Sequence, residues 1–206
     1  MANVGVNAAH RARSPLFPEG TFRLLPIPEH GGWARPMLRL KDVGDLAEHA
    51  PPSWLNLPVH FDPDFRSEIS TYGDNCRRAP RAFALRNARP GDRILFLVRL
   101  HPIDGPAAFF LAGELEVADI LPDVTRDPGP GWWDNNAHVR RARAHREWDS
   151  FWVFRGTPAS GLYARARPFG RSDAEQLFGD GWNWRPSRTE LQTIGSYTRT
   201  IRQVPA

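Results

Sequence analysis

The sequence predicts an α+β fold: a small mixed β-barrel flanked by short helices and long ordered loops, in one domain over residues 1–206. Two apolar runs of strand length, 93–100 and 108–119, follow each other closely and indicate adjacent buried strands. The stretch 11–28 is rich in proline, which removes backbone donors, so it is expected to wrap the domain as an ordered loop. No repeat, low-complexity run or linker divides the chain, which favours one domain over two.

In the first half, a sharp turn separates a helix from the first long strand. Pro90 fixes φ and Gly91 tolerates positive φ, so the chain turns there into the strand 93–100. The other elements expected in this half are a strand over 2–6, a short helix near Val43–Glu48, a short strand entering a turn over 57–65, and a helix over Arg81–Asn87.

The second half alternates strands, loops and capped helices. Asn135 or Asn136 is suited to cap a helix over His138–Arg146, because a side-chain oxygen there accepts from the first free backbone N–H groups. Capping-box patterns predict two later helices. The full set is a loop over 122–132, strands over 150–155 and 162–168, a helix from Ser172 with Glu175 through Phe178, and a final helix from Ser187 with Glu190 through about Gln203.

Positive charge is clustered along the chain. The formal net charge is +4, and Lys41 is the only lysine among 27 basic residues. Arginines gather in 77–99 and 138–171, while the segment 104–127 is acidic. Such clustering is typical of a phosphate-facing surface, although ordinary solvated faces give the same pattern. The predicted phosphate-binding residues are Arg77, Arg78, Arg81, Arg93, Arg140 and Arg141.

The eight tryptophans are distributed unevenly. Trp132-Trp133 and Trp182-Asn-Trp184 lie in loops rich in glycine and proline, where an indole is well placed to stack on a nucleobase. The alternative is that these indoles fold back and close the ends of the barrel. The predicted base-binding residues are Trp132, Trp133, Trp182, Trp184, Asn7 and Arg11.

A short polar motif offers candidate catalytic groups. His60, Asp62 and Asp64 could carry out general acid–base chemistry, and the alternative is a turn at Asp62-Pro63 with Asp64 capping the next residues. His138 and His145, seven residues apart, share one face of the arginine-rich helix. The sequence shows no further ligands close to them, so we expect no metal site and no cofactor.

Several classes of protein are excluded or disfavoured. Cys76 is the only cysteine, so no intrachain disulfide or cysteine-based zinc cluster can form, and the adjacent Arg77 and Arg78 would favour its thiolate. The Walker A, dinucleotide-binding, nucleophile-elbow and zinc-protease motifs are missing from the sequence. No apolar run approaches the ~18 residues of a membrane span, and the first residues do not match a signal peptide. We therefore expect a cytoplasmic protein.

Some of these motifs resemble known families. The helix, Pro90-Gly-Asp92 turn and strand are similar to the PUA-like superfamily of EVE, ASCH and YTH domains, which implies a nucleic-acid-handling barrel that often grips a single base. Ser14–Glu29, His60–Asp64 and the strands after Pro90 resemble three ordered elements of the nucleotide modification associated domain 3 family. That resemblance implies a role in handling or making modified nucleotides, in a bacterial or phage setting.

The leading functional hypothesis is a nucleic-acid-binding domain for a modified base, associated with DNA or nucleotide modification. Indoles would hold the base in an aromatic slot while arginines contact phosphates. An enzyme acting on a nucleotide or nucleic-acid base through His60, Asp62 and Asp64 is the first alternative, and a protein-interaction domain is the second. The expected partner is DNA in preference to RNA, or a free nucleotide, with no membrane. Catalysis and the oligomeric state are left open.

Overall fold

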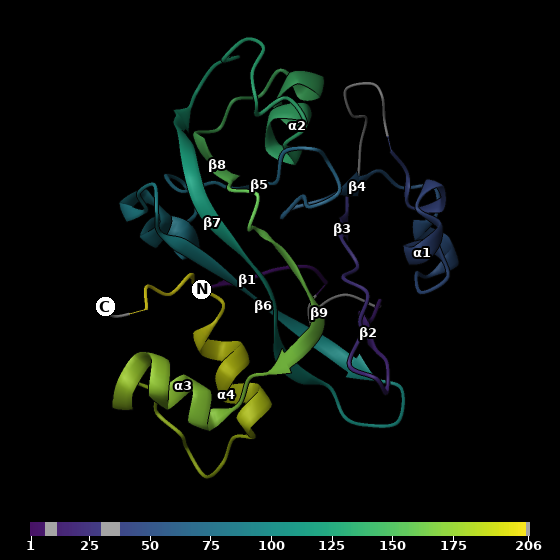
Figure 1. The fold of residues 1–206 in the computed structure, drawn as a ribbon, viewed down its shortest axis with the longest axis vertical. Coiled ribbons are helices and arrows are strands. Elements are labelled where there is room, and N and C mark those ends of the chain that lie inside the picture. Colours follow the sequence, from purple (N-terminus) through teal and green to yellow (C-terminus); the bar gives the residue numbers. More distant parts are fainter. Residues whose placement is uncertain (7–11, 30–37, 205–206) are drawn as a thin grey trace.

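One long strand organises the fold. The structure, a computed structural model, describes residues 1–6, 12–29 and 38–204. The strand β7 (Ala108–Val124) pairs antiparallel with β6 (Arg93–Pro102), β8 (Phe151–Gly156) and β9 (Gly161–Pro168). It changes partner along its length, and the sheet curls around it as a half-barrel (Figure 1). The strand β5 (Thr71–Asp74) extends the sheet by pairing antiparallel with β8.

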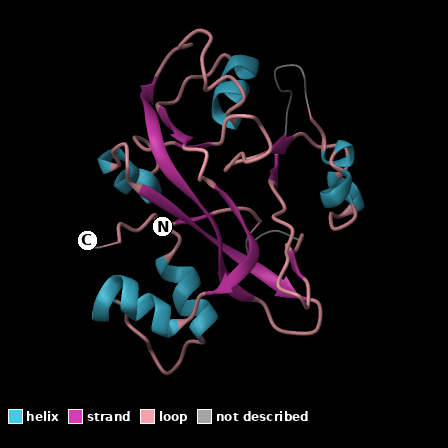
Figure 2. Cartoon of the chain, viewed as in Figure 1, coloured by secondary structure: helices cyan, strands magenta, loops and turns pink. Residues whose placement is uncertain are grey.

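Short strands and helices surround this sheet (Figure 2). Two N-terminal strands, β1 (Ala2–Asn3) and β2 (Pro15–Leu16), run parallel to β6. The strands β3 (Ile27–Pro28) and β4 (Val59–His60) form a separate antiparallel pair. The α-helices are α1 (Gly44–Ala47), α2 (Ala137–His145), α3 (Arg171–Phe178) and α4 (Glu190–Tyr197). No helix in the described part of the chain combines the length and the apolar character that crossing a membrane requires.

Apolar packing fixes α2 against the sheet. Val139 and Ala142 are buried on one face of α2 and belong to the same core cluster as Phe151 and Val153 of β8. The main core lies along β6, β7 and β8, while α3 and α4 cover a second cluster at the other end of the molecule (Figure 1). The polar residues that begin α2 are therefore held close to β5 and β8.

A mixed α/β architecture with short flanking helices is confirmed, while the predicted small β-barrel is a curled half-barrel sheet. Both long strands are present and extend beyond their predicted ends. Asn136 is the cap of α2, since its side chain accepts a hydrogen bond from the backbone N–H of His138. Residues 80–87 form a 3-10 helix, where the sequence predicted a helix without specifying its type.

Three local predictions were wrong. The loop expected from residue 122 begins later, because Pro122 lies within β7 between Leu121 and Val124, where the register shifts and a missing donor is tolerated. The helix α3 begins at Arg171, one residue before the predicted Ser172. The side chain that bonds back to its first turn is Asp173 rather than Glu175, and it accepts from the backbone N–H of Gly170. The helix α4 is capped by Thr189, not Ser187, and ends at Tyr197 rather than near residue 203.

Candidate functional site

Four ionisable side chains meet where the β3–β4 pair faces the start of α2. We call Glu29, His60, Asp62 and His138 the histidine–carboxylate cluster. Pairing of β3 with β4, continued by the hydrogen bond from Glu29 N to the Pro58 carbonyl, sets Glu29 beside His60. His138 reaches the same point from α2, 76 residues after Asp62.

The side chains of the cluster are within hydrogen-bonding reach of one another. His60 Nδ1 donates to Glu29 Oε1 at 2.8 Å, and His138 Nε2 donates to Asp62 Oδ2 at 3.0 Å. His60 Nε2 lies 3.7 Å from the same Asp62 oxygen. The two imidazoles meet edge to face, with ring centroids 5.0 Å apart. One carboxylate oxygen of Asp62 is thus shared by two histidines.

Residues of strand β5 hold the cluster in place. Gly73 N donates to Asp62 Oδ1 at 2.8 Å, which leaves the other carboxylate oxygen toward the histidines. Gly73 also leaves room for His138, because a Cβ at residue 73 would lie 2.7 Å from His138 Cδ2. Asn136 Nδ2 donates to Thr71 Oγ1 at 3.1 Å and ties the first turn of α2 to the same strand.

The electrostatics of the cluster follow from its mutual hydrogen bonds. Burial alone would lower the pKa of His60, but the carboxylates of Asp62 and Glu29 outweigh burial and raise that pKa to about 9. Burial alone would raise the pKa of Asp62, but the hydrogen bond from His138 and the nearby His60 imidazole bring that pKa below its usual range. The pKa of Glu29 is lowered in the same way, against burial, chiefly by His60.

The cluster is recessed but reachable. The exposed side-chain fractions are 15% for His60, 6% for Asp62, 16% for His138 and 18% for Glu29. A small depression of about 30 Å³ lies beside it, lined by His138, Arg141, Ala142, His145, Glu147, Asp149 and Phe151. Arg141 is half exposed, and its Nη1 is 3.8 Å from Glu29 Oε1. An anion at this edge would therefore meet a guanidinium group.

The predicted phosphate-binding arginines do not gather in one place. Arg140 and Arg141 lie on α2, and Arg141 is close to Glu29 of the cluster. Arg81 makes a two-pronged ion pair with Asp74, and Arg77 pairs with Asp123. Arg78 and Arg93 are exposed. Contact of these six arginines with phosphate stays a prediction.

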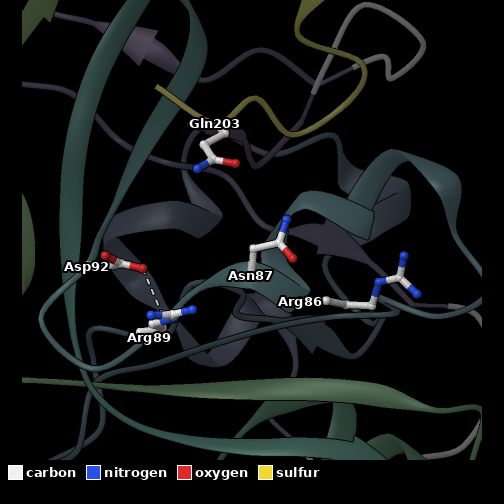
Figure 3. A pocket seen from close by; sticks show the side chains of 5 residues that line it. All are labelled: Arg86, Asn87, Arg89, Asp92 and Gln203. Carbon is white, nitrogen blue, oxygen red and sulfur yellow. Dashed lines mark hydrogen bonds between the residues drawn. The ribbon is translucent and has the colours of Figure 1, made fainter. Parts of the chain in front are cut away.

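The arginine-rich segment also borders a larger open depression, of about 520 Å³ (Figure 3). Arg86, Asn87, Arg89, Asp92 and Gln203 line it. Within it, the Asp92 carboxylate accepts from the backbone N–H of Arg89 at 2.8 Å. Arg86 lies over the Phe83 ring, 4.5 Å from its centre. This depression is polar and open, and its groups do not converge on one point as those of the histidine–carboxylate cluster do.

The two predicted tryptophan pairs lie in different parts of the fold. Trp132 and Trp133 meet edge to face and pack on the cluster of apolar residues beneath α2. Trp182 is 6% exposed and stacks on Tyr197 and Phe178 beside α3 and α4, with Trp184 next to it. Figure 1 shows α2 and the α3–α4 pair at opposite ends of the molecule. The four indoles therefore do not share one slot, and base contact by each pair stays a prediction.

The three remaining predicted site residues, Asp64, Asn7 and Arg11, are not part of the cluster that the structure describes. Asp64 Oδ1 accepts from the backbone N–H groups of Arg66 and Ser67, and Asp64 Oδ2 accepts from the Ser67 hydroxyl. Asp64 thus caps the turn at residues 65–67. Asn7 and Arg11 lie outside the residues that the structure describes.

Cys76 does not have the predicted thiolate character. The side chain is buried, and its Sγ lies 3.3 Å from the Asp74 carbonyl oxygen. Burial and the nearby Asp74 carboxylate raise the pKa of the thiol well above its usual range. Arg77 and Arg78 are exposed, and charges in solvent do little for a buried sulfur.

Sequence reasoning found half of the cluster. The motif at residues 60–64 identifies His60 and Asp62, whereas His138 is recognisable only as one of two histidines on a face of the arginine-rich helix. Glu29 ends the stretch Ser14–Glu29 that resembles a family element, but nothing in that stretch marks its carboxylate as part of a site. Only the β3–β4 pairing and the docking of α2 bring these residues together.

The fold and the cluster define a mixed α/β protein with a recessed centre of two histidines and two carboxylates. The family model for nucleotide modification associated domain 3 matches residues 1–202, and the chain belongs to that family. Comparison with curated proteins and with solved structures finds no match. The family description associates the chain with nucleotide modification.

Proposed function

We propose that this protein binds a nucleotide, or an exposed base of a nucleic acid, and modifies it at the histidine–carboxylate cluster. The observation that carries the proposal is the convergence of His60, Asp62 and His138 from distant segments onto one carboxylate oxygen. Gathering ionisable groups in a recess costs free energy, which apolar side chains would avoid. Membership of the nucleotide modification associated domain 3 family supports a nucleotide as the class of substrate.

The cluster offers acid–base groups with fixed orientations. Histidine is the side chain most often used to move protons in catalysis, and it needs a partner that fixes its ring. Asp62 is such a partner for His138, and Glu29 for His60. The exocyclic groups of a base and the hydroxyls of a sugar are substrates of matching chemistry.

The edge of α2 suits a phosphate group. Arg141 and His145 line the depression beside His138, at positions three and seven residues further along the helix, so they share its face. A guanidinium group recognises phosphate oxygens through paired, charge-assisted hydrogen bonds. The phosphate of a nucleotide would then sit beside α2 while its base or sugar faces the cluster.

A second candidate is a base reader without turnover, as the aromatic-slot hypothesis states. It is favoured by Trp132, which is only partly buried and has the Arg155 guanidinium 5.6 Å from its ring centre. This candidate includes a relationship to PUA-like domains, which is supported by the curled sheet with its short helices. Stacking on Trp132 and Trp133 would hold a base next to the start of α2.

Both candidates require binding of a nucleotide or nucleic acid, so binding is tested first. Isothermal titration with the four deoxynucleoside 5′-monophosphates, and anisotropy with short labelled DNA and RNA strands over a salt series, should both show association. Arg141→Gln should weaken binding about 10- to 100-fold, because one charge-assisted contact is worth roughly 1.5–3 kcal/mol. Arg188→Gln, an exposed arginine near α4, is the matched control and should bind as the native protein does. Absence of binding to every probe at low salt would refute the proposal.

Turnover is tested by mass spectrometry of nucleosides from DNA, RNA and the nucleotide pool of cells that express the protein. A new or missing nucleoside with the native protein, abolished by Asp62→Asn and kept in Asp104→Asn, is the expected result. Loss of binding in Trp132→Ala with no nucleoside change in any sample would instead favour the base reader.

A further inference from the structure

We propose that His60, Asp62 and His138 form a three-ligand site for a divalent first-row transition metal such as Zn²⁺ or Fe²⁺. One donor atom from each residue lies within 4.8 Å of the other two. The inference deepens the proposed function, which uses the same cluster, but metal binding is measured without turnover. The two can therefore fail separately.

The donor spacing fits a single ion. Donor atoms bound to one ion at about 2.1 Å lie about 3.0 Å apart at right angles and about 3.4 Å apart in a tetrahedron. Asp62 Oδ2 is 3.0 Å from His138 Nε2 and 3.7 Å from His60 Nε2. These two distances bracket the required values, and the two histidine donor atoms lie within 4.8 Å of each other, so side-chain rotations can bring all three atoms onto one centre.

The surroundings of the ligands have the form found around metal-bound histidines. A ligating histidine usually donates its other ring nitrogen to a carboxylate, which fixes the ring and strengthens the ligand. His60 Nδ1 donates in this way to Glu29 at 2.8 Å, which leaves Nε2 toward Asp62. Asp62 Oδ1 is held by Gly73 N, so Oδ2 is the oxygen that faces the histidines.

Charge and access favour a cation with open coordination positions. The recess brings together the carboxylates of Asp62 and Glu29, whose combined charge a divalent ion balances. Two imidazoles and one carboxylate select first-row transition ions over Mg²⁺ or Ca²⁺, which prefer oxygen ligands. Three protein ligands leave at least one position for water or substrate, and His138, one of the three, lines the depression described above.

The competing interpretation is a metal-free network in which Asp62 simply bridges two imidazoles. Both interpretations keep the same residues in contact, so stability measurements do not separate them. They differ in what the protein binds. A metal site takes up one ion per chain and changes the spectrum of a bound cobalt ion, whereas the metal-free network does neither.

The test uses the full chain, stripped with a chelator and titrated with ZnCl₂ by calorimetry and with CoCl₂ by visible absorption. We expect one ion per chain and the d–d bands of nitrogen-ligated Co²⁺. Asp62→Asn and His138→Gln should each weaken affinity at least 100-fold, and Glu29→Gln about 10- to 100-fold. His101→Gln and Asp104→Asn, at the far end of β6 and in the turn after it, are controls and should leave affinity unchanged.

A second readout needs no variant and so does not depend on whether the variants fold. Paramagnetic Co²⁺ should broaden the ring signals of His60 and His138 in the native protein, while those of His49 and His101 stay sharp. Failure to take up a stoichiometric ion would overturn the inference. Uptake that leaves the ring signals of His60 and His138 sharp, or that survives both Asp62→Asn and His138→Gln, would overturn it as well.

Discussion

Gly73→Ala should damage the cluster although none of its four residues is replaced. A Cβ at residue 73 would lie 2.7 Å from His138 Cδ2 and 3.1 Å from Asn136 Oδ1. Carbon atoms in contact prefer about 3.5 Å, so the imidazole must retreat by roughly 0.8 Å. Metal and catalytic centres tolerate only a few tenths of an ångström.

The expected result is loss of both stability and affinity. Overpacking of this kind costs about 1–3 kcal/mol, and disturbance of the Asn136 cap adds to it. Urea denaturation should show that decrease, and Zn²⁺ titration of the folded variant should show at least a tenfold weaker site. Gly161→Ala is the matched control, because Gly161 lies in strand β9 and its Cβ would meet nothing within 4 Å. Equal stability and zinc affinity in both variants would refute the packing argument.

Three further changes test other parts of the structure. Asn136→Ala removes the α2 cap and the hydrogen bond to Thr71, and should lower the free energy of unfolding, measured in urea, by about 1–2 kcal/mol. Asn135→Ala, at an exposed residue, should change that free energy little, and equal effects of the two variants would contradict the assignment of the cap. Cys76 should resist iodoacetamide in the native protein and react after denaturation in guanidinium, because burial keeps it a thiol, and rapid native labelling would contradict its burial. Trp182→Ala should lower the free energy of unfolding by about 3–5 kcal/mol, and the folded variant should keep its nucleotide affinity. An unfolding curve like that of the native protein would show that the stack of Trp182 on Tyr197 is not part of the core.

Helices and strands were easier to predict from the sequence than the place where they bring the histidine–carboxylate cluster together. Strands β6 and β7 were recognisable because their apolar runs need no knowledge of the partner. The α2 cap was also predictable, since Asn136 acts on a residue two positions away. Local chemistry of this kind leaves a local signal.

The cluster depends instead on contacts across long stretches of chain. His60 and Asp62 were found as a short motif, but their partner is 76 residues from Asp62, and Glu29 is 31 residues before His60. Helix α2 reaches Asp62 because its apolar face packs on β8, which pairs with β5. Neither step is visible in local sequence. For the same reason, two similar tryptophan pairs could not be assigned from sequence to opposite ends of the fold.

The most direct test of the central claim is long-range proton–nitrogen NMR of the seven histidine rings during titration with the deoxynucleoside 5′-monophosphates. We predict saturable shifts at His60 and His138, with His49 and His101 unchanged. Shifts confined to other histidines, or nucleotide binding that leaves His60 and His138 unmoved, would show that the histidine–carboxylate cluster is not where the nucleotide binds.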